Sequence, residues 1–171
     1  PLEEGAAYVK LDHKYLKRTR NSQGIMIGTA RTNPGKHISH PSHLDDAQHS
    51  APLRRVYEGL CSLGVDALIS IGGDDTLKTA NKLKMFMDRL PAGAKKLPVV
   101  HLPKTIDNYV SQTDITFGFD SGMRIATEAI DRLHTTATSH HRVIVCEVMG
   151  HDAGWLALGS GIAGGADVIL I

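Results

Sequence analysis

The hydrophobic and polar positions divide the chain into a polar first part and an alternating second part. Residues 1–50 are mostly polar, with one short apolar run at 25–27 and a stretch over 31–50 that is rich in His, Pro, Ser and Asn. From Ala51 onward, apolar residues recur at helical spacing or form short continuous runs. Periodic apolar residues predict amphipathic helices, and short apolar runs bounded by turn residues predict buried strands. The second part is therefore predicted to alternate between helices and strands.

Helices are predicted at four places in this part. Ser50 can cap the first helix, which has Pro52 in its first turn and ends at Gly64. The others cover residues 76–90, residues 120–135 and a short segment near Trp155.

Strands are predicted between the helices, at residues 67–71, 99–102, 143–148 and 168–171. Each is a nearly continuous apolar run, which is typical of strands covered on both faces of a parallel sheet. Such strands in alternation with helices indicate an α/β fold with a doubly wound, mostly parallel sheet and helices on both faces. Ligands of such sheets bind beyond the carboxyl ends of the strands, so the loops that follow strands form the candidate site.

Composition and charge exclude several classes of partner. The 171 residues are 42% hydrophobic, and 19 Lys and Arg oppose 18 Asp and Glu. This balance gives no long-range attraction for nucleic acid, and no apolar run approaches the roughly 20 residues that span a bilayer. We expect a cytoplasmic protein that binds neither nucleic acid nor membrane.

The two ends of the chain predict a single partial domain over residues 1–171. The chain opens at Pro1 without Met, and it closes on the apolar run 168–171 with no turn or cap after it. An unpaired apolar strand of this kind promotes aggregation, so we expect these residues to be part of a longer protein.

The first candidate loop, residues 72–76, has the sequence Gly-Gly-Asp-Asp-Thr. Its glycines allow a close approach to a ligand, and the amides of the helix that follows attract phosphate. The carboxylates of Asp74 and Asp75 would repel a bare phosphate, whereas a divalent cation could bridge the two. The alternative is a plain turn in which Asp74 or Asp75 caps the helix.

The second and third loops also follow predicted strands. The second loop, residues 103–108, places the ammonium of Lys104, the hydroxyl of Thr105 and the carboxylate of Asp107 together. These groups can hold a phosphorylated substrate and take a proton from an attacking hydroxyl, although alone they could form a polar turn. The third loop, residues 149–155, passes through glycines into a helix and again presents amides to an anion. Three such loops at one sheet edge are hard to explain by turn chemistry alone.

In order and spacing, the motifs of this chain resemble the phosphofructokinase family. The matching segments are residues 28–34, 72–76, 103–108, 116–120, 141–142 and 147–150. The resemblance implies the transfer of a phosphoryl group to the C1 hydroxyl of fructose 6-phosphate in glycolysis. It also implies a Mg²⁺ cofactor and a homo-oligomer, either a dimer or a tetramer.

The resemblance further implies roles for single residues. Asp107 would be the catalytic base, Lys104 and Thr105 would flank the transferring phosphoryl group, and Asp74 would hold Mg²⁺. The residues that would contact the donor phosphates are Gly73, Asp75 and Arg31. The residues that would contact the sugar are Thr105, Arg142, Met149 and Gly150, with Arg142 reaching the 6-phosphate across a subunit interface.

Asp75 and Lys104 favour pyrophosphate as the phosphoryl donor. Family members that use ATP resemble this chain but have glycine at both positions. The Asp75 side chain fills space that the rest of ATP would need, and Lys104 supplies charge for the compact pyrophosphate. ATP stays open as the alternative donor, as does a more distant kinase such as an NAD kinase.

Two departures from the family pattern leave a non-catalytic, regulatory homologue open. Tyr109 stands where the family usually has Asp, and His151 stands where it usually has Arg. The family's glycine-rich N-terminal loop and its C-terminal sugar-phosphate lobe also lie outside this sequence, so we expect the isolated chain to be inactive. The histidines of residues 37–49, with Asp45 and Asp46, could ligate zinc, but a solvated loop is the favoured interpretation.

Overall fold

The structure, a computed structural model, describes residues 2–17, 19 and 28–171. The chain consists of two compact units, residues 1–65 and residues 66–171. The apolar run 25–27 lies outside the described residues. In the described part, no helix has both the length and the apolar character needed to span a bilayer.

The first unit contains a short helix, α1 (His13–Leu16), a 3₁₀ turn, η1 (Pro41–Leu44), and the helix α2 (Ala47–Ser62). Helix α2 begins earlier than predicted, because the Asp46 side chain accepts a hydrogen bond from the backbone N–H of Gln48 at 2.8 Å. Ser50, the predicted cap, lies inside the helix, and its hydroxyl donates to the Asp46 carbonyl at 2.6 Å. The acidic residue is therefore the true start signal of α2.

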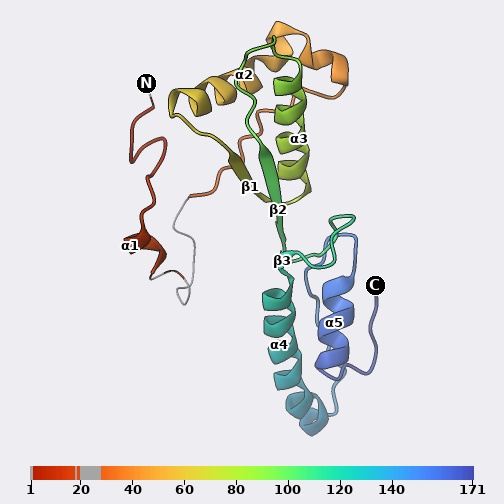
Figure 1. Ribbon diagram of the computed structural model, residues 1–171. Coiled ribbons are helices and arrows are strands. Elements are labelled where there is room, and N and C mark those ends of the chain that lie inside the picture. Colours follow the sequence, from red (N-terminus) through yellow and green to blue (C-terminus); the bar gives the residue numbers. More distant parts are fainter. Residues whose placement is uncertain (1, 18, 20–27) are drawn as a thin grey trace. The chain divides into compact units, whose positions relative to one another are not determined.

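The second unit is built on a parallel sheet with the strand order β1-β2-β3 (Figure 1). Its strands are β1 (Leu68–Gly72), β2 (Val99–Thr105) and β3 (Phe117–Gly118). The register pairs Leu68 with Val99 and Gly72 with Pro103, so β1 and β2 end side by side. The strands predicted at 67–71 and 99–102 are confirmed, and β2 continues as far as Thr105, which lies beside Gly118 of β3.

Helix α3 (Asp74–Asp88) connects β1 to β2 and packs on both strands. It buries a stripe at helical spacing that consists of Ala80, Leu83, Phe86 and Met87. The other side of β1 carries Ile69 and Ile71, which are 63% and 54% exposed. The alternation of half-buried and exposed side chains along β1 follows from the two-residue period of a strand.

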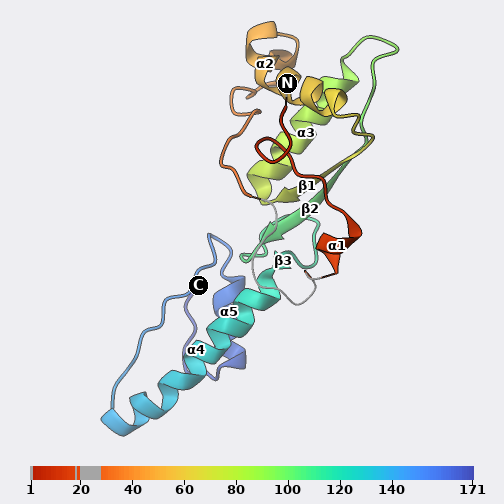
Figure 2. The same cartoon turned by 90° about the vertical axis from the view of Figure 1, so that its left-hand side faces the viewer.

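Helix α4 (Phe119–His140) follows β3 directly and runs alongside α5 (Trp155–Ala163), as Figures 1 and 2 show. Gly159 of α5 lies against the Met123 side chain of α4, since an added Cβ there would lie 2.7 Å from Met123 Sδ. Helix α4 is longer than the predicted 120–135. It ends at His141, whose left-handed backbone (φ 49°) lets the N–H of Arg142 donate to the Ala137 carbonyl at 2.9 Å.

The strands predicted at 143–148 and 168–171 are absent, and both segments lack regular secondary structure. Val143 and Val145 are 95% and 89% exposed, and Leu170 is 83% exposed. An apolar run shows a preference for extended backbone, but a strand forms only where a neighbouring strand supplies hydrogen-bond partners. In the described residues neither segment has such a neighbour.

Candidate active site

The structure brings the three predicted loops together at the carboxyl edge of the sheet. A Cβ added at Gly73 in the first loop would lie 3.8 Å from the carbonyl oxygen of Lys104 in the second. The same Cβ would lie 3.6 Å from the hydroxyl oxygen of Tyr109. The ring of Tyr109 stacks on the ring of His151 in the third loop, with a centroid distance of 4.9 Å. The prediction that these loops share one edge is thus met by contacts between them.

The first loop presents the N-terminus of α3 as a group of backbone donors. Gly73 is the N-cap and has no side chain to occupy the first free amides. Asp74 and Asp75 lie in the first helical turn, so the alternative in which one of them caps the helix is wrong. Gly72 is sterically required, since an added Cβ would lie 2.6 Å from the Cβ of Thr76. A phosphate can therefore approach the backbone closely at this point.

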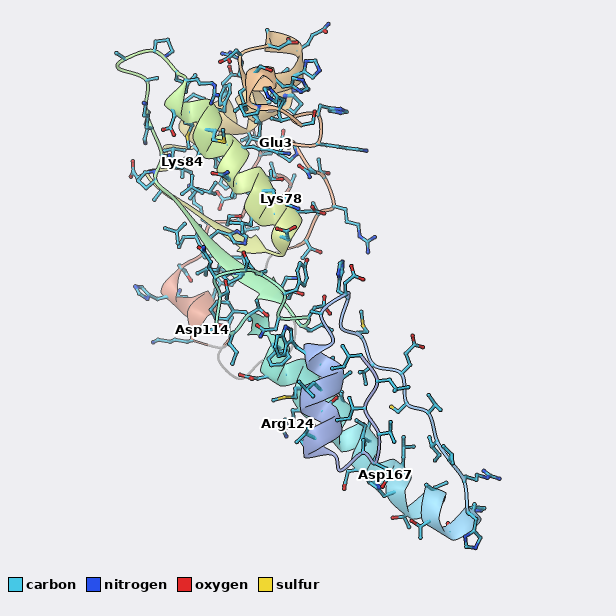
Figure 3. The ribbon with its side chains drawn as sticks, turned by 90° about the vertical axis from the view of Figure 1, so that its right-hand side faces the viewer. Glu3, Lys78, Lys84, Asp114, Arg124 and Asp167 are labelled. Carbon is cyan, nitrogen blue, oxygen red and sulfur yellow. The ribbon has the colours of Figure 1, made fainter. Side chains whose placement is uncertain are left out.

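Asp74 forms an ion pair with Lys78, one turn further along α3, at 2.5 Å between the carboxylate oxygen and Nζ. The hydrogen bond and charge of Asp74 raise the pKa of Lys78 above its ordinary value. Figure 3 labels Lys78 on α3. The first loop therefore combines free backbone donors with both signs of side-chain charge.

The second loop holds a carboxylate that has one engaged and one unengaged oxygen. The hydroxyl of Thr105 donates to Asp107 Oδ2 at 3.1 Å, and the Asp107 N–H donates back to that hydroxyl oxygen at 3.2 Å. Asp107 Oδ1 is buried and has no hydrogen-bond partner among the described residues. A buried acceptor without a partner costs about 1–3 kcal/mol, so this oxygen is suited to receive a proton or a ligand donor.

Thr116 and Asn108 support the second loop, and the sequence interpretation missed both roles. The buried hydroxyl of Thr116 donates to the Thr105 carbonyl at 2.7 Å, and the Thr116 N–H donates to Asn108 Oδ1 at 2.8 Å. Asn108 has a left-handed backbone (φ 54°), which Asn tolerates better than most residues. The residue type of Asn108 could have predicted its left-handed backbone. Its pairing with Thr116 could not be predicted, because it depends on the fold.

His101 is a third residue that the sequence interpretation missed. Its Nε2 lies 3.1 Å from the carbonyl oxygen of Gly72, and its Nδ1 lies 3.2 Å from the hydroxyl oxygen of Ser70. Since a carbonyl can only accept, Nε2 carries a proton, and in the neutral ring Nδ1 accepts from Ser70. This bond from β2 fixes the end of β1 where the first loop begins. The sequence did hold one indication of this role, because His101 is a polar residue inside an otherwise apolar strand.

Arg142 and Arg31 are not brought to this edge by the unit that carries it. Gly118, before the start of α4, adjoins Thr105, whereas Arg142 follows the far end of that helix. The 22 residues of α4 span about 33 Å at 1.5 Å per residue. Arg142 instead lines a largely apolar cavity of about 480 Å³ beside α4 and α5. Arg31 is exposed and belongs to the first unit.

The third loop places Met149 and Gly150 next to the residue that stacks on Tyr109. Met149 is 71% exposed, so its side chain is accessible to a ligand. In the described part of the chain, no group of three or more His, Cys, Asp or Glu side chains is arranged to hold a metal ion. This includes the histidines of residues 37–49, where the rings of His43 and His49 stack on each other at 4.5 Å.

A parallel α/β sheet whose carboxyl edge carries a helix N-terminus, a lysine and a buried carboxylate is the arrangement of a phosphoryl-transfer fold. The model of the family described as Phosphofructokinase matches residues 2–171. The chain belongs to the phosphofructokinase family, as its motifs predicted.

Similar proteins carry names with both phosphoryl donors. A pyrophosphate–fructose 6-phosphate 1-phosphotransferase of Streptomyces coelicolor is 53% identical over 171 residues, which are 100% of this chain and 44% of that protein. An ATP-dependent 6-phosphofructokinase 3 of Bacteroides thetaiotaomicron is 46% identical over 158 residues, which are 92% of this chain and 43% of that protein. The chain therefore spans less than half the length of these relatives.

Solved structures confirm the predicted α/β fold class. The structure of phosphofructokinase from Saccharomyces cerevisiae matches with a TM-score of 0.67 and 36% sequence identity. The match covers 84% of this chain and 20% of the yeast chain.

Proposed function

We propose that the protein transfers a phosphoryl group from pyrophosphate to the C1 hydroxyl of fructose 6-phosphate. The observation that carries this proposal is the buried oxygen Oδ1 of Asp107, which has no partner among the described residues. Its loop approaches the N-terminus of α3, a group of donors that can bind phosphate, at Gly73. Family membership supplies the reaction class. The two donors in the names of relatives make the choice of pyrophosphate the finer part of the proposal.

Each side chain of the site has its own role in the proposed reaction. The C1 oxygen of the sugar attacks the terminal phosphorus, the bond to the bridging oxygen breaks, and orthophosphate leaves. Asp107 takes the proton of the attacking hydroxyl, while Thr105 holds the carboxylate in place through its bond to Oδ2. Lys104 and the amides at the start of α3 stabilise the charge of the phosphates, together with Gly73. Met149 and Gly150 bind the sugar.

The carboxylates of the first two loops fit a Mg²⁺ ion. Mg²⁺ keeps several waters and binds through one or two carboxylates and the substrate phosphates, so it does not need a cluster of three protein ligands. Asp74 would hold it, and the unpartnered oxygen of Asp107 lies after the neighbouring strand. When bound, the ion neutralises charge on the donor phosphates.

Replacing the base tests the assignment of Asp107. In the protein at its full natural length, Asp107→Asn should lower kcat by about 10²–10⁴-fold, because the amide cannot take the proton. Phosphoryl transfer is measured by orthophosphate release with fructose 6-phosphate and pyrophosphate. Asp131→Asn, the same change at an exposed position of α4, should leave the rate unchanged. An Asp107→Asn enzyme with the wild-type rate would refute the role.

Two side chains are proposed to select pyrophosphate. Asp75 lies exposed in the first turn of α3 and Lys104 lies exposed near the end of β2, on loops that approach each other at Gly73. The double substitution Asp75→Gly and Lys104→Gly removes the bulk and charge that exclude ATP. We expect kcat/KM for pyrophosphate to fall and that for ATP to rise. A wild-type enzyme that uses ATP and not pyrophosphate would contradict the donor assignment.

ATP is the second candidate donor, because relatives at 46% and 50% identity are named ATP-dependent. Both donors use the same base, metal and sugar contacts, so the Asp107 experiment bears on either. Absence of transfer from both donors, together with binding to a catalytic relative, would favour the non-catalytic homologue.

A further inference from the structure

Tyr109 and His151 form a stacked pair between the second and third loops. Their ring centroids are 4.9 Å apart and their planes are inclined by 18°. Aromatic pairs at such distances attract each other beyond the area that they bury, particularly when the rings are offset. The two residues lie 42 positions apart in the sequence. Positions 109 and 151 are also the two at which this chain departs from the family pattern.

The surroundings of each ring show that the pair ties three loops together. The hydroxyl of Tyr109 lies over Gly73 in the first loop, 3.6 Å from the position of an added Cβ. His151 has a left-handed backbone (φ 52°), which is strained for a residue with a side chain. Its Nδ1 also lies 3.3 Å from Asp152 Oδ2, an exposed neighbour. The stack on Tyr109 is thus a contact that joins His151 to another loop.

Among the described residues, no hydrogen bond joins the third loop to the second. A hydrogen bond inside it runs from the Ala153 N–H to the Gly150 carbonyl at 3.1 Å. Glycines at 150 and 154 give its backbone wide conformational freedom. A loop with internal bonds and flexible glycines needs external contacts to hold one position. Gly154 lies against Ile171, and the ring of Tyr109 supplies the contact with the second loop.

We propose that Tyr109 and His151 act as one positioning pair, which holds Met149 and Gly150 at the distance from Asp107 that the sugar requires. The inference rests on the proposed function, because it assigns the third loop to the acceptor. Opposite charges placed at the same two positions would attract each other across the same gap, which gives an independent way to restore the contact.

The kinetic test removes each ring and then restores it, in the protein at its full natural length. Tyr109→Leu and His151→Leu should each raise KM for fructose 6-phosphate by roughly 2- to 12-fold, the range that the attraction of one aromatic pair allows. KM for the phosphoryl donor and kcat should change by less than about twofold. Tyr109→Phe and His151→Phe keep a ring at each position and should stay near the wild-type KM.

The double variants decide whether the two residues act as a unit. If they do, Tyr109→Leu with His151→Leu is no worse than either single variant. Two effects that multiply, or an equal rise in donor and acceptor KM, would overturn the proposal.

A second experiment replaces the two rings with opposite charges. Tyr109→Asp and His151→Arg should each raise KM for the sugar, and the double variant should recover most of the loss. No recovery would also count against a paired role.

Amide hydrogen exchange of a peptide over residues 149–155 separates this inference from the proposed function. We expect faster exchange in both Leu variants than in the wild type and the Phe variants, because the loop opens more often without the stack. An enzyme that transfers no phosphoryl group from either donor, yet shows this exchange pattern, would disprove the proposed function. It would still support the inference that the two rings hold the third loop in place. Equal exchange in the Leu variants and the wild type would disprove the pair alone.

Discussion

Thr116 secures the backbone of the second loop with a single hydroxyl. Its side chain is 1% exposed, and its oxygen donates to the Thr105 carbonyl and lies 3.2 Å from Asn108 Oδ1. Thr105 is the last residue of β2, so this bond holds the backbone at the point where the strand ends. One buried side chain therefore fixes the position of the residue that orients Asp107.

Thr116→Val keeps the shape of this side chain and removes its hydrogen bonds. The Thr105 carbonyl then loses a buried partner, which should lower the free energy of unfolding by about 1–3 kcal/mol. Urea denaturation of both proteins measures the difference. Thr116→Ser keeps the hydroxyl and should cost less than the valine variant. A valine variant as stable as the wild type would show that the bond contributes nothing to stability.

The chemistry of single residues was predictable where residue type alone carries it. Lys104, Thr105 and Asp107 were predicted as one group in a loop after residue 102, and the structure places Lys104 and Thr105 at the last two positions of β2 and Asp107 just after them. The bond from His101 to Gly72 was not predicted, because it depends on the register that places Ser70 opposite His101. Register is a property of two strands together, and a single segment does not contain it.

At the scale of elements, helix ends depend on which polar side chain reaches the first free amides. At α2 this is Asp46, which accepts from the Gln48 N–H and from His49 Nδ1 at 2.6 Å. The hydrogen bond from His49 is the main reason that the pKa of Asp46 lies below its ordinary value. The cap is therefore strongest when Asp46 is ionised.

The pKa of Asp46 predicts how the cap of α2 depends on pH. A carboxyl whose pKa is lower in the folded than in the unfolded state stabilises the fold above the unfolded pKa, about 3.9. That contribution disappears as the pH falls through the folded pKa. Asp46→Asn should therefore be less stable than the wild type at pH 7, and the difference should shrink towards pH 3. Thermal unfolding at several pH values measures it, with Asp131→Asn as the control.

The helices were located by their apolar period, and their ends were displaced by local capping. The Gly73 cap advances α3 to Asp74, and the left-handed His141 extends α4 beyond residue 135. The strands at 143–148 and 168–171 were mispredicted for a different reason. Their composition favours a strand, but pairing needs a neighbouring strand, and composition says nothing about neighbours.

At the scale of the whole molecule, the distance between Arg142 and Asp107 raises the question of which site Arg142 serves. Helix α4 separates the two ends of the unit by about 33 Å, since its 22 residues each rise 1.5 Å. A guanidinium at that distance cannot contact a substrate held by Asp107 of the same chain. If Arg142 binds the sugar phosphate, it does so in the site of another subunit, as the family resemblance implies.

Mixed oligomers test this shared site. Asp107→Asn and Arg142→Ala variants should each be inactive alone. In a mixed dimer, one site would combine an intact Asp107 with the other subunit's intact Arg142. Equal co-expression followed by random pairing should therefore recover about one quarter of wild-type activity. Both residues acting within one chain would leave every mixed dimer inactive, and that outcome would refute the shared site.

The continuity of β1, α3 and β2 along residues 68–105 has a consequence for biosynthesis. The two strands pair directly, and only one helix and its connections separate them, so the entropy of closing this loop is modest. A ribosome delivers residues 68–105 before α4 and the third loop emerge. The edge with Asp74 and Lys104 can therefore assemble during synthesis, so that the segment with His151 would dock onto a surface that already exists.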